Sequence, residues 1–188
     1  MLPVGRSGAV IEALKHFEQV VVAEFAGIED SIEMHAEPCA LPERMIARAV
    51  GERLVRAVLA CPDGVRRMSM SMPGLVQTSS NLARVVSDGR TVRLQSLLRS
   101  SVNSEKEELG QAFEALFTLA GARVELTGSY DGWKPDMDSP ILKAMTASYE
   151  ALYGRKPLVT AIHAGLECGI IGGKYPGLDM ISFGPTIC

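Results

Sequence analysis

Residues 75–98 read LVQTSSNLARVVSDGRTVRLQSLL, and this stretch decides the fold. Two apolar-rich runs, 75–86 and 91–98, flank the tetrapeptide SDGR. An Asp-Gly pair between two strand-like runs is a strong signal for a β-hairpin. The stretch therefore predicts two antiparallel strands, and the rest of the fold is built around them.

The segments around the hairpin predict further helices and strands. Ser7 to Gly27 has helical periodicity, and a capping box of Ser104 and Glu107 opens a helix that Gly121 ends. Pro42 is expected to open another helix that runs to Cys61. Residues 29–130 thus read strand, helix, strand, strand, helix, strand, with the outer strands at 31–36 and 123–130. This order predicts an α+β fold, a ferredoxin-like βαββαβ sandwich with two helices on one face of an antiparallel sheet.

The pattern changes after the sequence DGWKPDMDSP. A helix is expected from Ser139 and Pro140, then a strand at 158–164, a short glycine-flanked helix and a strand at 178–184. This alternation is typical of a short α/β segment rather than of a sandwich. We therefore expect two domains, residues 1–131 and residues 132–188.

Composition narrows the class of protein. The 188 residues are 47% hydrophobic and 22% charged with a net charge of −3, which is ordinary for a soluble globular protein and gives no basic field for nucleic acid or an anionic membrane. The four cysteines lack paired spacing and predict free thiols in a reducing compartment. No apolar run approaches the roughly 18 residues of a membrane span, and no signal peptide is recognisable. We expect a cytoplasmic protein, and the apolar last residues suggest a part of a longer chain.

The stretch 163–186, HAGLECGIIGGKYPGLDMISFGPT, raises the question of a metal or nucleophile site. A zinc site needs three or four ligands at helical or knuckle spacing, and His163, Glu167 and Cys168 do not provide them. A nucleophile elbow needs a glycine two residues before the nucleophile, where this sequence has Leu166. Glu167 is left as a carboxylate directly after an expected core strand, and strand ends are where α/β proteins build sites. We therefore take Glu167 as a candidate ligand-facing residue.

Asn81 and Arg99 are polar residues within the hairpin strands. Such residues are often only the solvent face of a strand, and that interpretation stays open. The alternative is that an amide and a guanidinium at one strand end hold a carboxylate, for which the arginine fork is suited. A two-residue Asp-Gly turn would place Arg99 opposite Thr78 and leave Asn81 and Arg99 on different faces. Bringing them together requires a bulge or a longer loop.

Four stretches, in this order, resemble the aminoacyl-histidine dipeptidases, also called cytosol non-specific or Xaa-His dipeptidases, of the dizinc M20 metallopeptidases. They are PGLVQTSSNLARV (73–85), SLLRSSVNSEKE (96–107), YDGWKPDMDSPIL (130–142) and the stretch 163–186. The resemblance spans nearly the whole chain, and IHAGLECGI is a specific motif. It implies a catalytic domain interrupted by a lid domain, with residues 1–131 as the later part of the lid and 132–188 as the returning catalytic segment.

The resemblance also implies roles for residues. A lid asparagine and a lid arginine of these enzymes resemble Asn81 and Arg99, and Glu167 falls in a substrate-facing glycine-rich loop, so all three are expected to bind substrate. The intact enzyme would hold two zinc ions and hydrolyse dipeptides such as Xaa-His, and its lid is a candidate homodimer interface. The family's metal ligands and general base lie in segments that this chain does not contain, so we expect no catalytic residue and no metal ligand here. A non-catalytic α+β binding or dimerisation module that retains the lid fold remains the alternative.

Overall fold

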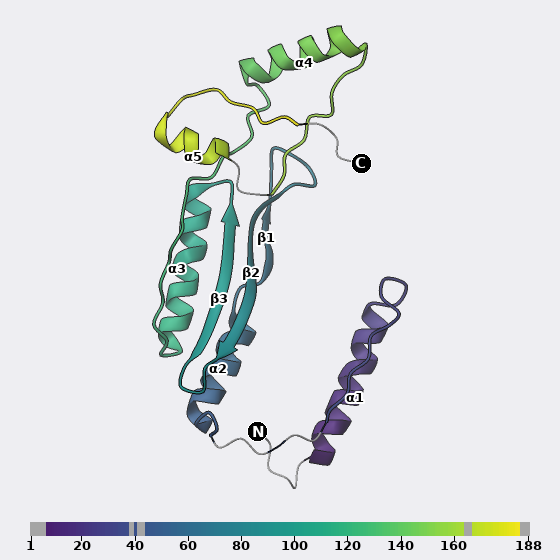
Figure 1. The fold of residues 1–188 in the computed structure, drawn as a ribbon, viewed down its shortest axis with the longest axis vertical. Helices are drawn as coiled ribbons and strands as arrows, with labels where there is room; N and C mark the ends of the chain where they lie inside the picture. Colours follow the sequence, from purple (N-terminus) through teal and green to yellow (C-terminus); the bar gives the residue numbers. More distant parts are fainter. Residues whose placement is uncertain (1–6, 38–39, 41–43, 164–166, 185–188) are drawn as a thin grey trace. The chain divides into compact units, whose positions relative to one another are not determined.

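A computed structural model describes residues 7–37, 40, 44–163 and 167–184. In chain order it contains α1 (Ser7–Glu24), α2 (Arg48–Ala60), β1 (Gly64–Met68), β2 (Val76–Ser87), β3 (Val92–Ser100), α3 (Asn103–Leu119), α4 (Pro140–Tyr153) and α5 (Glu167–Lys174) (Figure 1). The chain forms two compact units, Met1–Ala47 and Arg48–Cys188. The expected border between residues 131 and 132 rests on element order and resemblance, and it stays a prediction.

The first unit is built on α1. The helix ends three residues before the expected Gly27, which adopts a φ of 77° in the turn that follows. The chain then runs back along α1, where the Met34 backbone N–H donates to the Glu18 carboxylate at 2.9 Å. No residue of α1 is buried, and apolar side chains such as Phe17 and Val22 are exposed on it.

The second unit contains an antiparallel sheet of three strands in the order β1-β2-β3. Helix α2, the residue that follows it and helix α3 supply the buried core, and apolar side chains of β2 and β3 pack against it. The buried residues are Ala57, Cys61, Leu109, Phe113 and Phe117. Along β3 every second residue is exposed, as expected for a strand with one covered face. We call the covered side the helix face and the other side the open face.

The hairpin of β2 and β3 differs from the expected one in two ways. Its loop has four residues, because Ser87 pairs with Val92. The Asp88 side chain closes this loop by accepting from the backbone N–H groups of Thr91 and Arg90, which lowers the pKa of its carboxyl to about 2. Further along, the register shifts by one residue between Leu82 and Arg84, which is a β-bulge.

The α+β class is confirmed, but several expected strands are not formed. Within the described residues, the segments 31–36, 123–130, 158–163 and 178–184 belong to no sheet. A strand exists only where a neighbour accepts its backbone hydrogen bonds, and a local apolar pattern does not supply that neighbour. Leu158 and Phe183 in two of these segments stay 90% and 79% exposed, which shows that no layer covers them here. Residue 164 of the third segment lies outside the described residues.

Two helix starts also differ from expectation. Helix α2 begins at Arg48, and Pro42 lies outside the described residues. Helix α3 begins at Asn103, and its N-cap is Val102, whose side chain accepts no hydrogen bond. The expected capping box of Ser104 and Glu107 is therefore wrong. The chain reaches α3 directly from β3, and the Val102 backbone N–H donates to the Ser100 hydroxyl at 3.1 Å.

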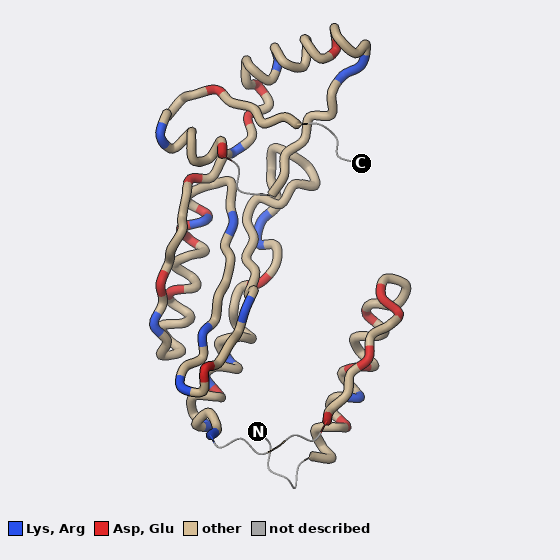
Figure 2. The backbone as a smooth tube through the Cα atoms, viewed as in Figure 1, with Lys and Arg blue, Asp and Glu red and all other residues tan. Residues whose placement is uncertain are grey.

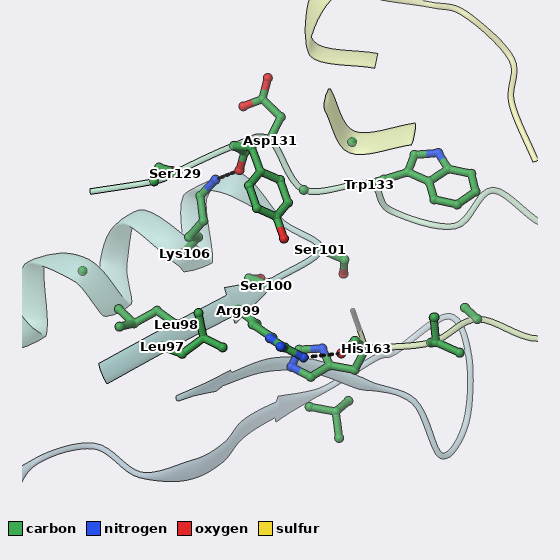
Figure 3. A pocket seen from close by; sticks show the side chains of 18 of the residues that line it. Leu97, Leu98, Arg99, Ser100, Ser101, Lys106, Ser129, Asp131, Trp133 and His163 are labelled. Atoms are coloured by element: carbon green, nitrogen blue, oxygen red, sulfur yellow. Dashed lines mark hydrogen bonds between the residues drawn. The ribbon is translucent and has the colours of Figure 1, made fainter. Parts of the chain in front are cut away.

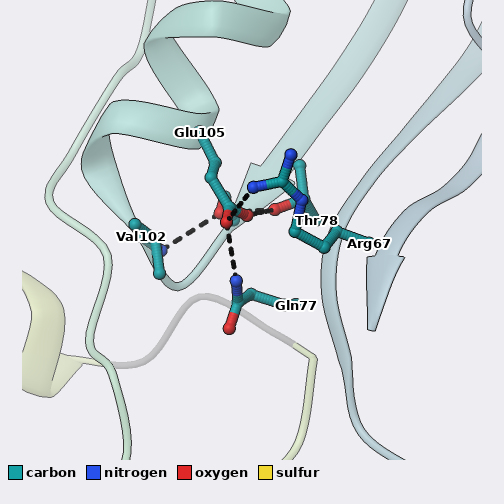
Figure 4. A network of polar contacts seen from close by, with 6 residues as sticks. Arg67, Gln77, Thr78, Val102 and Glu105 are labelled. Carbon is teal, nitrogen blue, oxygen red and sulfur yellow. Dashed lines mark hydrogen bonds and ion pairs between the residues drawn. The ribbon is translucent and has the colours of Figure 1, made fainter. Parts of the chain in front are cut away.

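Glu105 joins the first turn of α3 to the sheet (Figure 4). Its carboxylate accepts hydrogen bonds at 2.8 Å from both Arg67 of β1 and Gln77 of β2, and a further one from the Thr78 hydroxyl. Partial burial by itself would raise the pKa of Glu105. The hydrogen bonds from Thr78, Gln77 and Arg67, together with the Arg67 charge, outweigh it and hold the pKa below 4.5.

We predict that Glu105→Gln lowers the free energy of unfolding by about 2 kcal/mol at pH 7, since hydrogen bonds to a charged group contribute about 1.5–3 kcal/mol. Because the folded-state pKa is lowered, this contribution is complete above pH 4.5 and is lost as the pH falls through the folded-state pKa. Urea unfolding at several pH values measures it. Glu114→Gln, an exposed change on the same helix, is the control. A difference between Glu105→Gln and the native protein that grows on acidification would contradict the assignment.

Candidate functional site

The bulge decides which side chains share the open face. Beyond it, Ser79 lies opposite Arg99 and Asn81 lies opposite Leu97. Directly opposite residues project from the same face, and so do residues two apart on one strand. Asn81 and Arg99 therefore share the open face, where both are exposed. A four-residue loop without the bulge would shift the pairing by two residues relative to a two-residue turn. Such a shift leaves Arg99 on the face opposite to Asn81.

His163 lies over this part of the open face (Figure 3). Its ring Nε2 is 2.7 Å from the Ser79 hydroxyl, and its main-chain oxygen accepts a hydrogen bond from Arg99 Nη1 at 3.3 Å. One residue thus contacts both members of the cross-strand pair Ser79–Arg99. The segment that carries His163 comes from far along the chain and is fixed to the sheet by these two contacts.

The charge of His163 follows from its surroundings. Burial lowers the pKa of the imidazole below 6.5, and the positive charge of Arg99 lowers it further. A backbone hydrogen bond to Val76 acts in the opposite direction but is outweighed. At neutral pH the ring is therefore uncharged and does not repel the guanidinium.

The segment at residues 131–133 closes the adjoining side. The Asn103 side chain donates to the Asp131 carboxylate at 3.0 Å and accepts from the Gly132 backbone N–H at 2.8 Å. Gly132 packs so closely on β3 that a Cβ there would lie 2.5 Å from the Ser101 carbonyl carbon. A Cβ at Gly169 of α5 would likewise lie 2.5 Å from the Asp131 carbonyl oxygen. This segment is held between α3, the end of β3 and α5, and a Cβ at either glycine would clash with the backbone.

These elements enclose a cavity of about 780 Å³, which is in the range of small-molecule sites. The end of β3, the start of α3 and the segments 125–135 and 160–163 line most of it. Figure 3 shows Arg99, His163, Lys106 and Trp133 around it. Figure 2 shows basic residues along the sheet and mostly acidic residues along α3. The Lys106 ammonium donates a hydrogen bond to the Tyr130 main-chain oxygen.

The three residues expected to bind substrate are placed differently. Arg99 lines the cavity. Asn81 lies on the same open face, but neither it nor Glu167 is among the described residues that line the cavity. Glu167 is the first residue of α5 and is exposed, and the neighbouring residues 164–166 of its motif lie outside the described residues.

Sequence reasoning missed Ser79 and His163 as a pair. His163 was considered only as a metal ligand, and Ser79 was not a candidate. The two are 84 positions apart, so no local pattern joins them.

Comparison with known proteins gives one consistent result. No family model matches the chain. It is 33% identical over 171 residues to the cytosol non-specific dipeptidase of Escherichia coli K12, covering 91% of this chain and 35% of that protein. It superimposes on the crystal structure of aminoacylhistidine dipeptidase from Vibrio alginolyticus with a TM-score of 0.91 at 37% identity, covering 98% of this chain and 38% of that one. The chain is related to the aminoacylhistidine dipeptidases.

The similarity extends over only part of the length of these dipeptidases. The chain spans about a third of the length of the relatives that it matches, 35% and 38%. Among the described residues, no three His, Cys, Asp or Glu side chains are grouped so that they could hold a metal ion. Nor does any helix in this part of the chain have the length and apolar character needed to cross a membrane.

Proposed function

We propose that this chain supplies lid and substrate-side contacts of a dipeptidase, with Arg99 as the anchor for the substrate's carboxylate. The observation that carries the proposal is the position of Arg99. Its guanidinium stands on the open face at the wall of a cavity of about 780 Å³, with one N–H engaged by a neutral main-chain oxygen. The relation to enzymes named as dipeptidases gives the substrate class.

The chemistry of Arg99 suits this role. A guanidinium offers five N–H donors in a planar fork and binds a carboxylate through two of them. In the described residues the Arg99 side chain forms no ion pair, and the hydrogen bond of its guanidinium is to the His163 carbonyl. The remaining donors are available to a carboxylate in the cavity. A dipeptide brings such a carboxylate at its C-terminus.

Asn81 and Glu167 have supporting roles in this proposal. Asn81 is a diagonal neighbour of Arg99 on the open face and offers a neutral amide to a substrate carbonyl. Glu167, exposed at the start of α5, offers a carboxylate to the substrate's amino group. Both roles require that the substrate reach beyond the cavity wall.

A zinc centre does not fit the described residues, because no suitable group of ligands is present among them. We therefore derive no reaction step through zinc. If the complete enzyme holds two zinc ions, their ligands and the catalytic carboxylate come from segments other than those described here. This chain's own residues then bind and orient the substrate.

We further propose a cytoplasmic location and a dipeptide as the main partner, without nucleic acid or membrane. The name of the Escherichia coli relative places that protein in the cytosol, and the described cysteines Cys61 and Cys168 are free thiols. A homodimer through the lid would give the apolar surface of α1 a partner.

In an active protein that contains this chain, Arg99→Ala should lower kcat/KM. The expected loss corresponds to a rise of about 2–4 kcal/mol in activation free energy, the range for removing one member of a desolvated charge pair. Steady-state kinetics with alanyl-histidine measure it. Arg93→Ala, an exposed arginine on the same strand, is the control and should leave kcat/KM unchanged. Equal effects of the two substitutions would show that Arg99 has no special role.

The chain by itself should bind no stoichiometric zinc and hydrolyse no dipeptide, because the described residues include too few grouped ligands to build an open catalytic site. Two measurements test this: metal analysis of the protein after dialysis against zinc, and an assay of dipeptide hydrolysis. Turnover that persists through purification would overturn the assignment of catalysis to other segments. Failure to bind any dipeptide would instead favour a non-catalytic module.

A further inference from the structure

We infer that Ser79 is a positioning residue that acts through His163 to hold the Arg99 guanidinium in its binding orientation. This inference rests on the proposed function, in which Arg99 anchors a carboxylate. Ser79 itself is not among the described residues that line the cavity, so its effect on a ligand must pass through its neighbours.

The geometry connects the three residues in a closed set. Ser79 and Arg99 are directly opposite on neighbouring strands. His163 spans the pair, with its ring on the Ser79 hydroxyl at 2.7 Å and its carbonyl on Arg99 Nη1 at 3.3 Å. The short contact fixes where the His163 main chain lies, and that main chain supplies the oxygen to which Arg99 donates.

The exposed position of Arg99 explains why a contact that restrains its side chain favours ligand binding. An exposed arginine on an open sheet face has many rotamers, and a ligand that selects one of them must overcome the lost side-chain entropy. A contact that holds the side chain before the ligand arrives removes part of this cost. The 3.3 Å hydrogen bond is long, so it restrains the side chain and leaves the remaining donors for a ligand.

The charge of His163 is compatible with this role. The uncharged ring keeps a second positive charge away from Arg99, so the hydrogen bond to the carbonyl is not opposed. The ring nitrogen near Ser79 accepts or donates according to its tautomer, and the hydroxyl can do either. The contact therefore needs a hydroxyl at residue 79, and threonine should replace serine.

A merely structural role for Ser79 predicts a different result from a positioning role. If Ser79 only stabilised the fold, its removal would weaken ligand binding equally whether or not Arg99 was present. If Ser79 acts through Arg99, removing it after Arg99 should change nothing.

The experiment is a double-mutant cycle on the full chain, with binding of alanyl-histidine followed by NMR titration. The C-terminal amide of the same dipeptide serves as the ligand without a carboxylate. Ser79→Ala should weaken binding of alanyl-histidine about fivefold, the value of one neutral hydrogen bond, and Arg99→Gln should weaken it more. Ser79→Ala in the Arg99→Gln background should have no further effect, and Ser79→Thr should bind as the native protein does.

Ser87→Ala, at the other end of β2, is the matched control, because the Ser87 hydroxyl is also hydrogen-bonded, accepting from the Gly89 backbone N–H, but lies at the hairpin loop. The His163 ring signals give a second readout, since Ser79→Ala should move the titration of this ring and Ser87→Ala should not.

Two outcomes separate the inference from its premise. If Arg99→Gln leaves binding unchanged, or the amide binds as well as the free dipeptide, the proposed function fails and the inference fails with it. If Arg99 matters but Ser79→Ala has no effect, or has the same effect with and without Arg99, the positioning role alone is overturned.

Discussion

The pairing of β2 with β3 shifts by one residue between Leu82 and Arg84, and the composition of both sheet faces depends on that shift. Side chains alternate between faces with a period of two, so an even change in register leaves the faces as they were and an odd change exchanges them. The four-residue loop is an even change from a two-residue turn, whereas the bulge is an odd one. Only the bulge brings Arg99 to the side that holds Asn81 and Ser79, and places Thr78 on the helix face beside Glu105.

The two faces then serve different purposes. On the helix face, Glu105 ties α3 to β1 and β2 and so fixes where the helix begins relative to the end of β3. That end is also where the segment at residues 131–133 packs, with Asn103 of α3 bonded to Asp131 and Gly132. On the open face, His163 covers the Ser79–Arg99 pair. The cavity lies between the segments that these contacts hold in place. Arg99 is the cationic residue of the sheet that lines it.

Sequence reasoning predicted the parts of this arrangement that are set locally. The hairpin at Asp88 and Gly89, the helices, and Arg99 as a candidate could all be read from periodicity and turn chemistry, and the family could be recognised from its motifs. The bulge could not, because Ala83, the extra residue, carries no turn or glycine signal. The loop length depends on the Asp88 side chain, which bonds two backbone N–H groups instead of allowing a tighter turn. Strands at 31–36 and 123–130 were predicted from their own pattern, but a ladder needs a neighbour. The contact between Ser79 and His163 depends on the tertiary fold alone.

The register of the hairpin is the claim on which the account most depends, and cross-strand NOEs in isotopically labelled protein measure it directly. Opposite residues in an antiparallel pair have Cα atoms about 4.5–5.5 Å apart, close enough for contacts between their backbone protons. The bulged register gives contacts of Arg99 with Ser79 and of Leu97 with Asn81. Contacts of Arg99 with Ser80 would mean the four-residue loop without a bulge, and contacts with Thr78 would mean a two-residue turn. Either result would separate Asn81 from Arg99 and contradict the proposed site.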